Sequence, residues 1–226
     1  MDTNKELLKI AFKRLSKQLK IPENFIIDIH DDENSWSFIS KLAQLIEGVF
    51  TTVLVQRLNE PEIFDTISNL PQAVRIILSH DLKIISRDQR FLFLTIAEIR
   101  NDYIHNISNV DSSLKDYLSN TKSERKKEIF KRFRPFLTDK EITTEYFIEN
   151  SRNIFFLACA LEIVKTHGDV EGLVASRRHK IFRTGQAEKL LPKQRVNALF
   201  LEDRMTVLNW MRNAKGVLKQ NGLLKT

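Results

Sequence analysis

Glycine is almost absent from the first three quarters of this chain of 226 residues, and this scarcity limits the folds open to it. Only Gly48 precedes residue 168, and the other five glycines lie at 168 or beyond. Glycine supplies the positive φ angles of tight turns and the close backbone approach of phosphate-binding loops. No glycine-rich phosphate loop can be drawn, so the P-loop and Rossmann nucleotide-binding motifs are excluded.

Apolar residues recur at helical spacing along this glycine-poor body. Short β-branched runs such as NFIIDIH and TTVLVQ lack a hairpin partner, so we predict no strands. The stretch 21–34 is expected to be a polar connection. The pattern predicts an all-α, helical-bundle fold, with helices at 4–20, 36–58, 61–69, 72–80, 87–107 and 138–167, the last ending at His167-Gly168.

Positive charge is concentrated at one end of the chain. Residues 169–226 hold twelve Lys/Arg against five Asp/Glu, which equals the whole net charge of +7. We therefore divide the chain into a helical body, 1–168, and a basic, partly helical C-terminal extension, 169–226, with a helix near 195–219. Such asymmetry indicates a polyanionic partner, most simply nucleic acid, although a solvated basic surface explains it equally well.

The densest basic cluster lies in the segment SRRHKIFR, where Phe182 interleaves the charges. Cationic side chains can contact phosphates while an aromatic ring stacks on a base, so this cluster is a candidate nucleic-acid-binding site. The alternative is an exposed basic linker. The candidate binding residues are Arg177, Arg178, His179, Lys180 and Arg183.

The number of cysteines and the length of the apolar runs indicate in which cellular compartment the protein lies. The single cysteine, Cys159, excludes an intramolecular disulfide and is expected to be a small buried apolar residue. Because zinc-ligand spacings are absent, we predict no metal or cofactor. No unbroken apolar run reaches the roughly 20 residues that span a bilayer, and the first residues lack a signal-peptide core. We expect a cytoplasmic protein without a membrane segment.

The stretch EIRNDYIHN, residues 98–106, is the strongest candidate for a functional site. Its polar residues follow a nearly unbroken apolar run, 91–99, in a helix whose start is predicted by a Ser86–Gln89 capping box. A central helix that becomes polar at one end delivers its polar groups to a cleft or an interface. By chance, a chain of this composition should contain only about 0.05 matches to an Arg, polar, three variable residues, His pattern.

That pattern, Arg100-Asn101-Asp102-Tyr103-Ile104-His105, resembles the signature of HEPN domains. The resemblance spans about 36–167 and implies an all-α bundle that forms a homodimer, with two motifs meeting in one composite site. Many HEPN domains are metal-independent endoribonucleases of toxin–antitoxin, antiviral defence or RNA-processing systems. On this resemblance Arg100, Asn101 and His105 would be catalytic, RNA the substrate, and an antitoxin or regulatory protein a partner.

The helix is also similar to that of the mannitol-operon repressor-like group within the same superfamily. This similarity implies an alternative function, a catalytically inactive regulator that binds a protein partner or DNA. The sequence also departs from many HEPN toxins, which have a tyrosine two residues after the histidine, where this chain has Ile107.

The residue types suit metal-free RNA cleavage by the neighbouring 2′-hydroxyl. A histidine can remove the hydroxyl proton or protonate the leaving 5′-oxygen, and a guanidinium can stabilise the charge on the phosphate. Asn101 could hold the histidine tautomer or contact the phosphate. The structural alternative is that Arg100 simply pairs with Glu98, Asp102 or an acid on a neighbouring helix, and that His105 only forms part of the helix end.

Overall fold

The computed structural model describes residues 3–106, 109–137 and 141–183, with the helical backbone alone for 3–8 and 177–183. Every regular element in these ranges is a helix, which confirms the predicted all-α class. The elements in chain order are α1 (Thr3–Leu19), α2 (Phe25–Asp31), α3 (Ser35–Leu58), η1 (Pro61–Ile63), α4 (Phe64–Ser68), α5 (Gln72–Asp81), α6 (Arg87–His105), α7 (Leu114–Asn120), α8 (Ser123–Phe133), η3 (Arg134–Phe136), α9 (Thr144–Glu149) and α10 (Ser151–Arg183).

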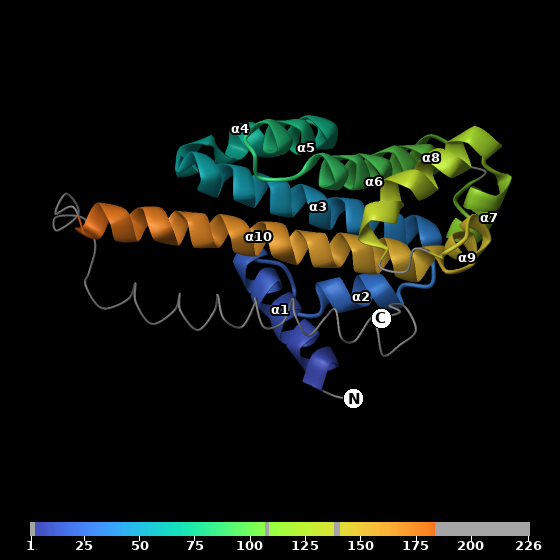
Figure 1. Ribbon diagram of the computed structural model, residues 1–226, viewed down its shortest axis with the longest axis horizontal. Coiled ribbons are helices and arrows are strands. Elements are labelled where there is room, and N and C mark those ends of the chain that lie inside the picture. Colours follow the sequence, from blue (N-terminus) through green and yellow to red (C-terminus); the bar gives the residue numbers. More distant parts are fainter. Residues whose placement is uncertain (1–2, 107–108, 138–140, 184–226) are drawn as a thin grey trace.

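Helix α3 lies at the centre of the bundle and packs against α1, α2, α4, α5, α6 and α10 (Figure 1). Its start is fixed by Asn34, whose side-chain oxygen accepts a hydrogen bond from the Ser37 backbone N–H at 2.8 Å. Its end is marked by Asn59, which adopts the left-handed conformation at φ 59°. Both ends agree with the predicted range.

The composition of α3 alone would also suit a membrane span. It has the length and mean hydropathy of one, although scattered polar residues prevent an unbroken apolar run. In the structure 61% of its most apolar window is buried against other helices, as is usual for the core helix of a bundle. Within the described residues, no other helix is long and apolar enough to cross a membrane.

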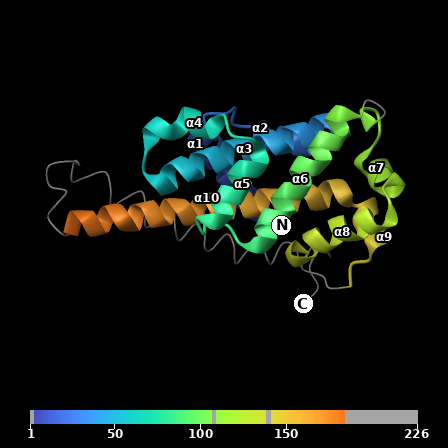
Figure 2. The same cartoon turned by 90° about the horizontal axis from the view of Figure 1, so that it is seen from above.

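The other helices cover α3 from opposite sides. Figure 1 shows α4, α5 and α6 above the α3–α10 pair and α1 and α2 below it, and Figure 2 shows the same bundle from above. At the α7–α9 end, a phenylalanine cluster joins three helices. The rings of Phe133 in α8 and Phe155 in α10 stack with centroids 4.2 Å apart, and Phe147 of α9 packs against both. These contacts hold α8 beside the end of α6.

The predicted polar connection 21–34 is wrong because it contains α2. Ile26 and Ile29 of this helix are completely buried. A helix of 7 residues is too short to show a clear apolar period, so its packing partners decide its conformation.

The predicted helix 138–167 also differs from the structure. Two helices, α9 and α10, meet at Asn150, and α10 continues through Gly168 to Arg183. A glycine inside a helix costs about 1 kcal/mol. Burial of Val170 and the contacts of Glu171 with Arg14 and Gln18 of α1 favour the continued helix.

Residue 168, at which the sequence divides body from extension, therefore lies inside a helix. The first part of the basic extension, 169–183, is the continuation of α10. Residues 184–226, including the helix predicted near 195–219, lie outside the described residues.

Candidate active site

The motif helix α6 is fixed at its start by the predicted capping box. The Gln89 backbone N–H donates to Ser86 Oγ at 3.2 Å, and the Ser86 N–H donates to Gln89 Oε1 at 2.7 Å. Gln89 also donates through its Nε2 to Glu162 of α10 at 2.7 Å. Leu92, Phe93, Ile96 and Ile99 are completely buried. The helix is therefore held along most of its length and ends at His105, in the motif.

The three predicted catalytic side chains are accessible. Arg100 is half-buried, and Asn101 and His105 are exposed. Tyr103, which is completely buried, holds the same turn against the bundle. Because an ideal helix turns 100° per residue, Arg100 and His105 point about 140° apart, with Asn101 between them.

One contact joins two members of the motif. Arg100 Nη1 donates a hydrogen bond to Asn101 Oδ1 at 3.1 Å. In the part of the chain that the structure describes, no hydrogen bond joins His105 to either residue. A single chain therefore brings Arg100 and Asn101 together and leaves the imidazole of His105 open to a substrate or to another chain.

The two acids nearest to Arg100 in sequence bind other residues. Glu98 accepts hydrogen bonds from Arg125 and from Arg132 of α8, the latter at 2.9 Å. The Asp102 carboxylate accepts from the Tyr117 hydroxyl of α7 at 2.5 Å. Arg100 forms no ion pair with any side chain that the structure describes. Its positive charge is thus not neutralised by these acids, contrary to the structural alternative.

Two tyrosines position the end of α6 and were missed by the sequence analysis. The Tyr103 hydroxyl donates to the Ser112 carbonyl at 3.3 Å, and the Tyr103 and Tyr117 rings lie 5.1 Å apart. Burial raises the pKa of both phenols above the usual range, and the hydrogen bond to Asp102 raises the pKa of Tyr117 further. Both therefore stay protonated and act as supports for the motif.

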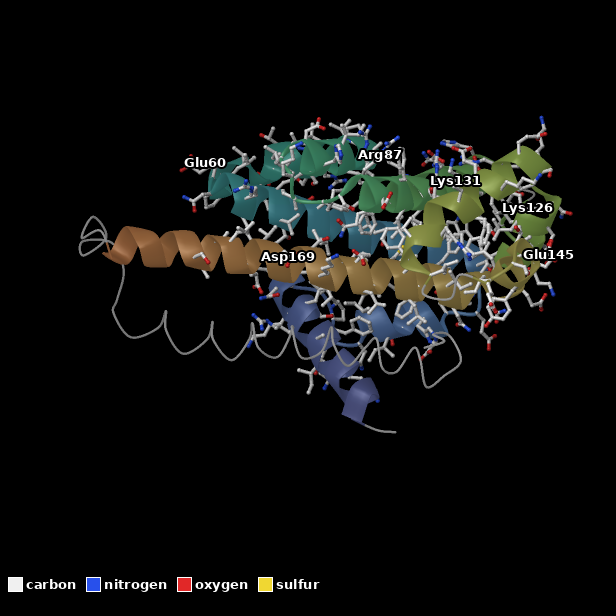
Figure 3. All side chains as sticks on the ribbon, viewed as in Figure 1. Glu60, Arg87, Lys126, Lys131, Glu145 and Asp169 are labelled. Atoms are coloured by element: carbon white, nitrogen blue, oxygen red, sulfur yellow. The ribbon has the colours of Figure 1, made fainter. Side chains whose placement is uncertain are left out.

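A basic surface on α8 lies beside α6 and was also missed. Residues 121–134 include seven Lys/Arg and two Asp/Glu, a signal visible in the sequence. Arg125 and Arg132 are bound to Glu98 and Glu128, and the Lys126 ammonium donates to the Ser119 carbonyl at 2.9 Å. Lys127 and Lys131 are exposed. Figure 3 shows Lys126 and Lys131 on the same side of the bundle.

The predicted nucleic-acid-binding cluster lies elsewhere. Arg177, Arg178, His179, Lys180 and Arg183 belong to the last turns of α10, and their side chains are outside the described residues. Figures 1 and 2 show this end of α10 at the opposite end of the bundle from α7, where α6 ends. One chain therefore does not bring this cluster to the motif, and its role in binding stays a prediction.

The structure gives no catalytic role to Cys159 and no metal site among the described residues. Cys159 is completely buried, as predicted, and burial raises the pKa of its thiol. Among the described residues, no group of three or more His, Cys, Asp or Glu side chains gathers into a metal site.

Comparison with known proteins adds no relative. No protein-family model matches the chain, and neither a curated protein nor a solved structure matches it. The fold and the candidate site described above are therefore the basis for the function proposed below.

Proposed function

We propose that this protein is a metal-independent endoribonuclease of HEPN type that cleaves RNA in a composite site formed by two chains. The observation that supports it most is the state of Arg100. This guanidinium is partly exposed at the end of a rigid core helix, and both neighbouring acids bind other residues. A merely structural arginine would be expected to form an ion pair within its own chain, and Arg100 forms none with the side chains that the structure describes.

The residue types assign a role to each motif side chain. His105 of one chain removes the proton of a ribose 2′-hydroxyl, and the resulting alkoxide attacks the adjacent phosphorus. The bond from phosphorus to the 5′-oxygen breaks, and the second chain's histidine gives that oxygen a proton. The products are a 2′,3′-cyclic phosphate and a 5′-hydroxyl. Arg100 stabilises the charge on the phosphate oxygens in the transition state.

Two histidines are needed because one imidazole cannot be base and acid in the same step. A homodimer supplies the second one, with Asn101 orienting Arg100 through the hydrogen bond described above. The exposed lysines of α8 lie beside this helix and would contact RNA phosphates. The cellular setting proposed is a toxin or antiviral defence system, with an antitoxin or regulatory protein as partner and the cytoplasm as location.

The test is cleavage of mixed cellular RNA in EDTA by the wild type, Arg100→Ala and His105→Ala. We expect cleavage by the wild type, with losses of about 100-fold or more in both variants, the usual size of a general acid–base contribution. Arg87→Ala, at the other end of the same helix, is the matched control and should keep its activity. A DNA strand with a single ribonucleotide should be cut only there.

Cleavage that persists in both variants would refute the proposed site. If the folded, dimeric wild type cleaves no RNA, the regulator remains, a catalytically inactive protein that binds a protein partner or DNA. Light scattering on the same samples establishes whether the wild type is a dimer.

A further inference from the structure

Within the first 168 residues, positive charge is gathered on and around helix α8. Residues 121–134 hold seven Lys/Arg and two Asp/Glu, a net charge of +5. The other 154 residues of 1–168 hold 17 Lys/Arg and 22 Asp/Glu, a net charge of −5. A polyanion would therefore be repelled by most of this body and attracted to α8.

Three lysines of α8 and its start are available to an anion. Lys122, directly before the helix, and Lys127 and Lys131 within it are exposed. None of the three forms an ion pair with a side chain in the described ranges. Lys127 and Lys131 are four residues apart, so they project from the same face of the helix. We call these three lysines the α8 surface.

The arginines of α8 hold this surface in place and are themselves neutralised. Arg125 and Arg132 both bind Glu98 of α6, and both also bind Glu128. Phe133 of the same helix is completely buried and anchors α8 in the core. Because two guanidinium groups are paired with two carboxylates, most of the remaining positive excess of α8 lies on its lysines.

The ion pairs of Glu98 show which side of α6 carries α8. Glu98 and His105 are seven positions apart, which is about 700° around an ideal helix, so their side chains point within about 20° of each other. The rise between them is about 10 Å. Arg100 points about 160° away from Glu98. A strand that brings a phosphate to His105 therefore lies on the side of the motif helix that faces α8.

We propose that the α8 surface binds the phosphates of the RNA strand beside the cleaved bond, on the His105 side of the site. The identity of the strand as RNA rests on the function proposed above, whereas the binding of a phosphodiester chain by α8 does not. Lysine ammonium groups bind phosphate as point charges and read no base. The surface therefore holds strands of any sequence, provided that they are long enough to reach from His105 to α8.

The position of the α8 surface determines which kinetic constant it affects. Its lysines are remote from the reacting atoms, so they contact the bound substrate and the transition state equally. Their loss should raise KM and leave kcat unchanged. A dinucleotide has a single phosphate and cannot occupy His105 and α8 at once. Its cleavage should therefore be insensitive to the α8 lysines.

The test measures the binding of a fluorescein-labelled oligouridine by fluorescence anisotropy. The full-length His105→Ala variant is the parent protein, so that binding is followed without cleavage. We expect Lys127→Gln/Lys131→Gln to weaken binding by about tenfold or more at about 0.1 M salt. The slope of log Kd against log salt should fall by about 1.4 for each chain that contacts the strand, since each phosphate contact to a single strand contributes about 0.7.

Two control variants separate the α8 surface from net charge and from side-chain packing. Lys9→Gln/Lys13→Gln removes the same charge at the same spacing from exposed lysines of α1, on the other side of the α3–α10 pair from α6 (Figure 1). It should bind the strand as the parent does. Lys127→Arg/Lys131→Arg keeps the charge and should also bind as the parent does. Thermal unfolding of each variant shows that it is folded.

Unchanged binding and an unchanged salt slope in Lys127→Gln/Lys131→Gln would overturn the proposal. An equal loss in the α1 variant would also overturn it, because net charge alone would then attract the strand. With His105 intact, a fall in kcat at constant KM would place these lysines in the chemistry instead. The ribonuclease is judged separately, since a wild type that binds the strand through α8 and cleaves none would refute cleavage and leave this inference standing.

Discussion

The Tyr117 hydroxyl of α7 donates a hydrogen bond to the Asp102 carboxylate of α6 at 2.5 Å. Asp102 lies two residues after Arg100, so the two side chains point about 200° apart around the helix. The same contact fastens the last turn of α6, where the motif lies, to α7. Tyr117 thus contributes to the position of the candidate site without belonging to the motif.

Tyr117→Phe removes this hydrogen bond and keeps the ring that packs on Tyr103. We expect the free energy of unfolding to fall by about 1 kcal/mol, because the bond is charge-assisted but the carboxylate is exposed to water. The control is Tyr146→Phe on α9, an exposed tyrosine whose loss should cost less than about 0.5 kcal/mol. Urea denaturation measures both, and equal effects would contradict the structural role of Tyr117.

The same tyrosines predict an optical signature. Burial raises the pKa of Tyr103 and Tyr117 above the ordinary tyrosine range, so two of the chain's three tyrosines resist ionisation while the protein is folded. The phenolate absorbance of the native protein near pH 11 should therefore be lower than the absorbance of three fully ionised tyrosines. Unfolding at higher pH should expose both phenols and bring the absorbance to the value for three ionised tyrosines. Full amplitude in the native state would show that both rings are open to water.

Glu98 joins α6 to α8 through Arg125 and Arg132. Glu98→Gln leaves two guanidinium groups facing a neutral amide, and we expect a loss of about 1 kcal/mol, limited because the carboxylate is partly exposed. The effect should shrink in high salt, which screens ion pairs near the surface. Glu124→Gln, an exposed acid at the start of α8, is the matched control and should change stability little in either salt concentration.

Local signals in the sequence predicted the ends of the motif helix correctly. The Ser86–Gln89 capping box is formed, and α6 ends within two residues of the expected position. The start of α3 is likewise set locally, because Asn34 is of a residue type that caps helices and accepts from the Ser37 N–H. These features depend on residues three or four apart, which is the range that periodicity and capping rules describe.

Periodicity and capping rules did not predict which charged residues bind each other. The sequence suggested that Glu98 or Asp102 could bind Arg100, since all three are neighbours. The structure pairs Glu98 with Arg125 and Arg132, which lie 27 and 34 residues further along the chain. Such pairs depend on how α8 packs on α6. The continuation of α10 past Gly168 has the same origin, because contacts with α1 favour a helix that local propensity would end.

Gly48→Ala should stabilise the protein. The residue lies in the interior of α3, and the added methyl group meets no heavy atom within 4 Å. Alanine restricts the unfolded chain and has the better helix propensity, so we expect the free energy of unfolding to rise by about 0.5–1 kcal/mol. Gly172→Ala in α10 should give a similar gain, since its Cβ is equally free of contacts. Destabilisation in either variant would mean that the position is more crowded than the structure shows.

The burial of His167 predicts that the protein loses stability in mild acid. The residue is 3% exposed, and burial, together with the charge of Arg14, lowers its pKa to about 4. Glu171 Oε2 lies 3.8 Å from His167 Nδ1, but this acid already binds Arg14 and Gln18. In the unfolded chain the imidazole has its ordinary pKa of about 6.5. Between these two values the unfolded state binds more protons, so the free energy of unfolding falls as pH falls through this window.

His167→Leu removes the titrating group. The decrease in the free energy of unfolding between pH 7 and pH 4 should therefore be smaller than in the wild type, by up to about 3 kcal/mol. Stability at pH 7 should change little by comparison, because the native imidazole is neutral there and its Nε2 has no hydrogen-bond partner in the described part of the chain. His105→Ala, which removes an exposed imidazole, is the control and should keep the wild-type slope. Urea midpoints at half-unit pH steps measure all three proteins, and parallel profiles for wild type and His167→Leu would show that folding does not lower the pKa of His167.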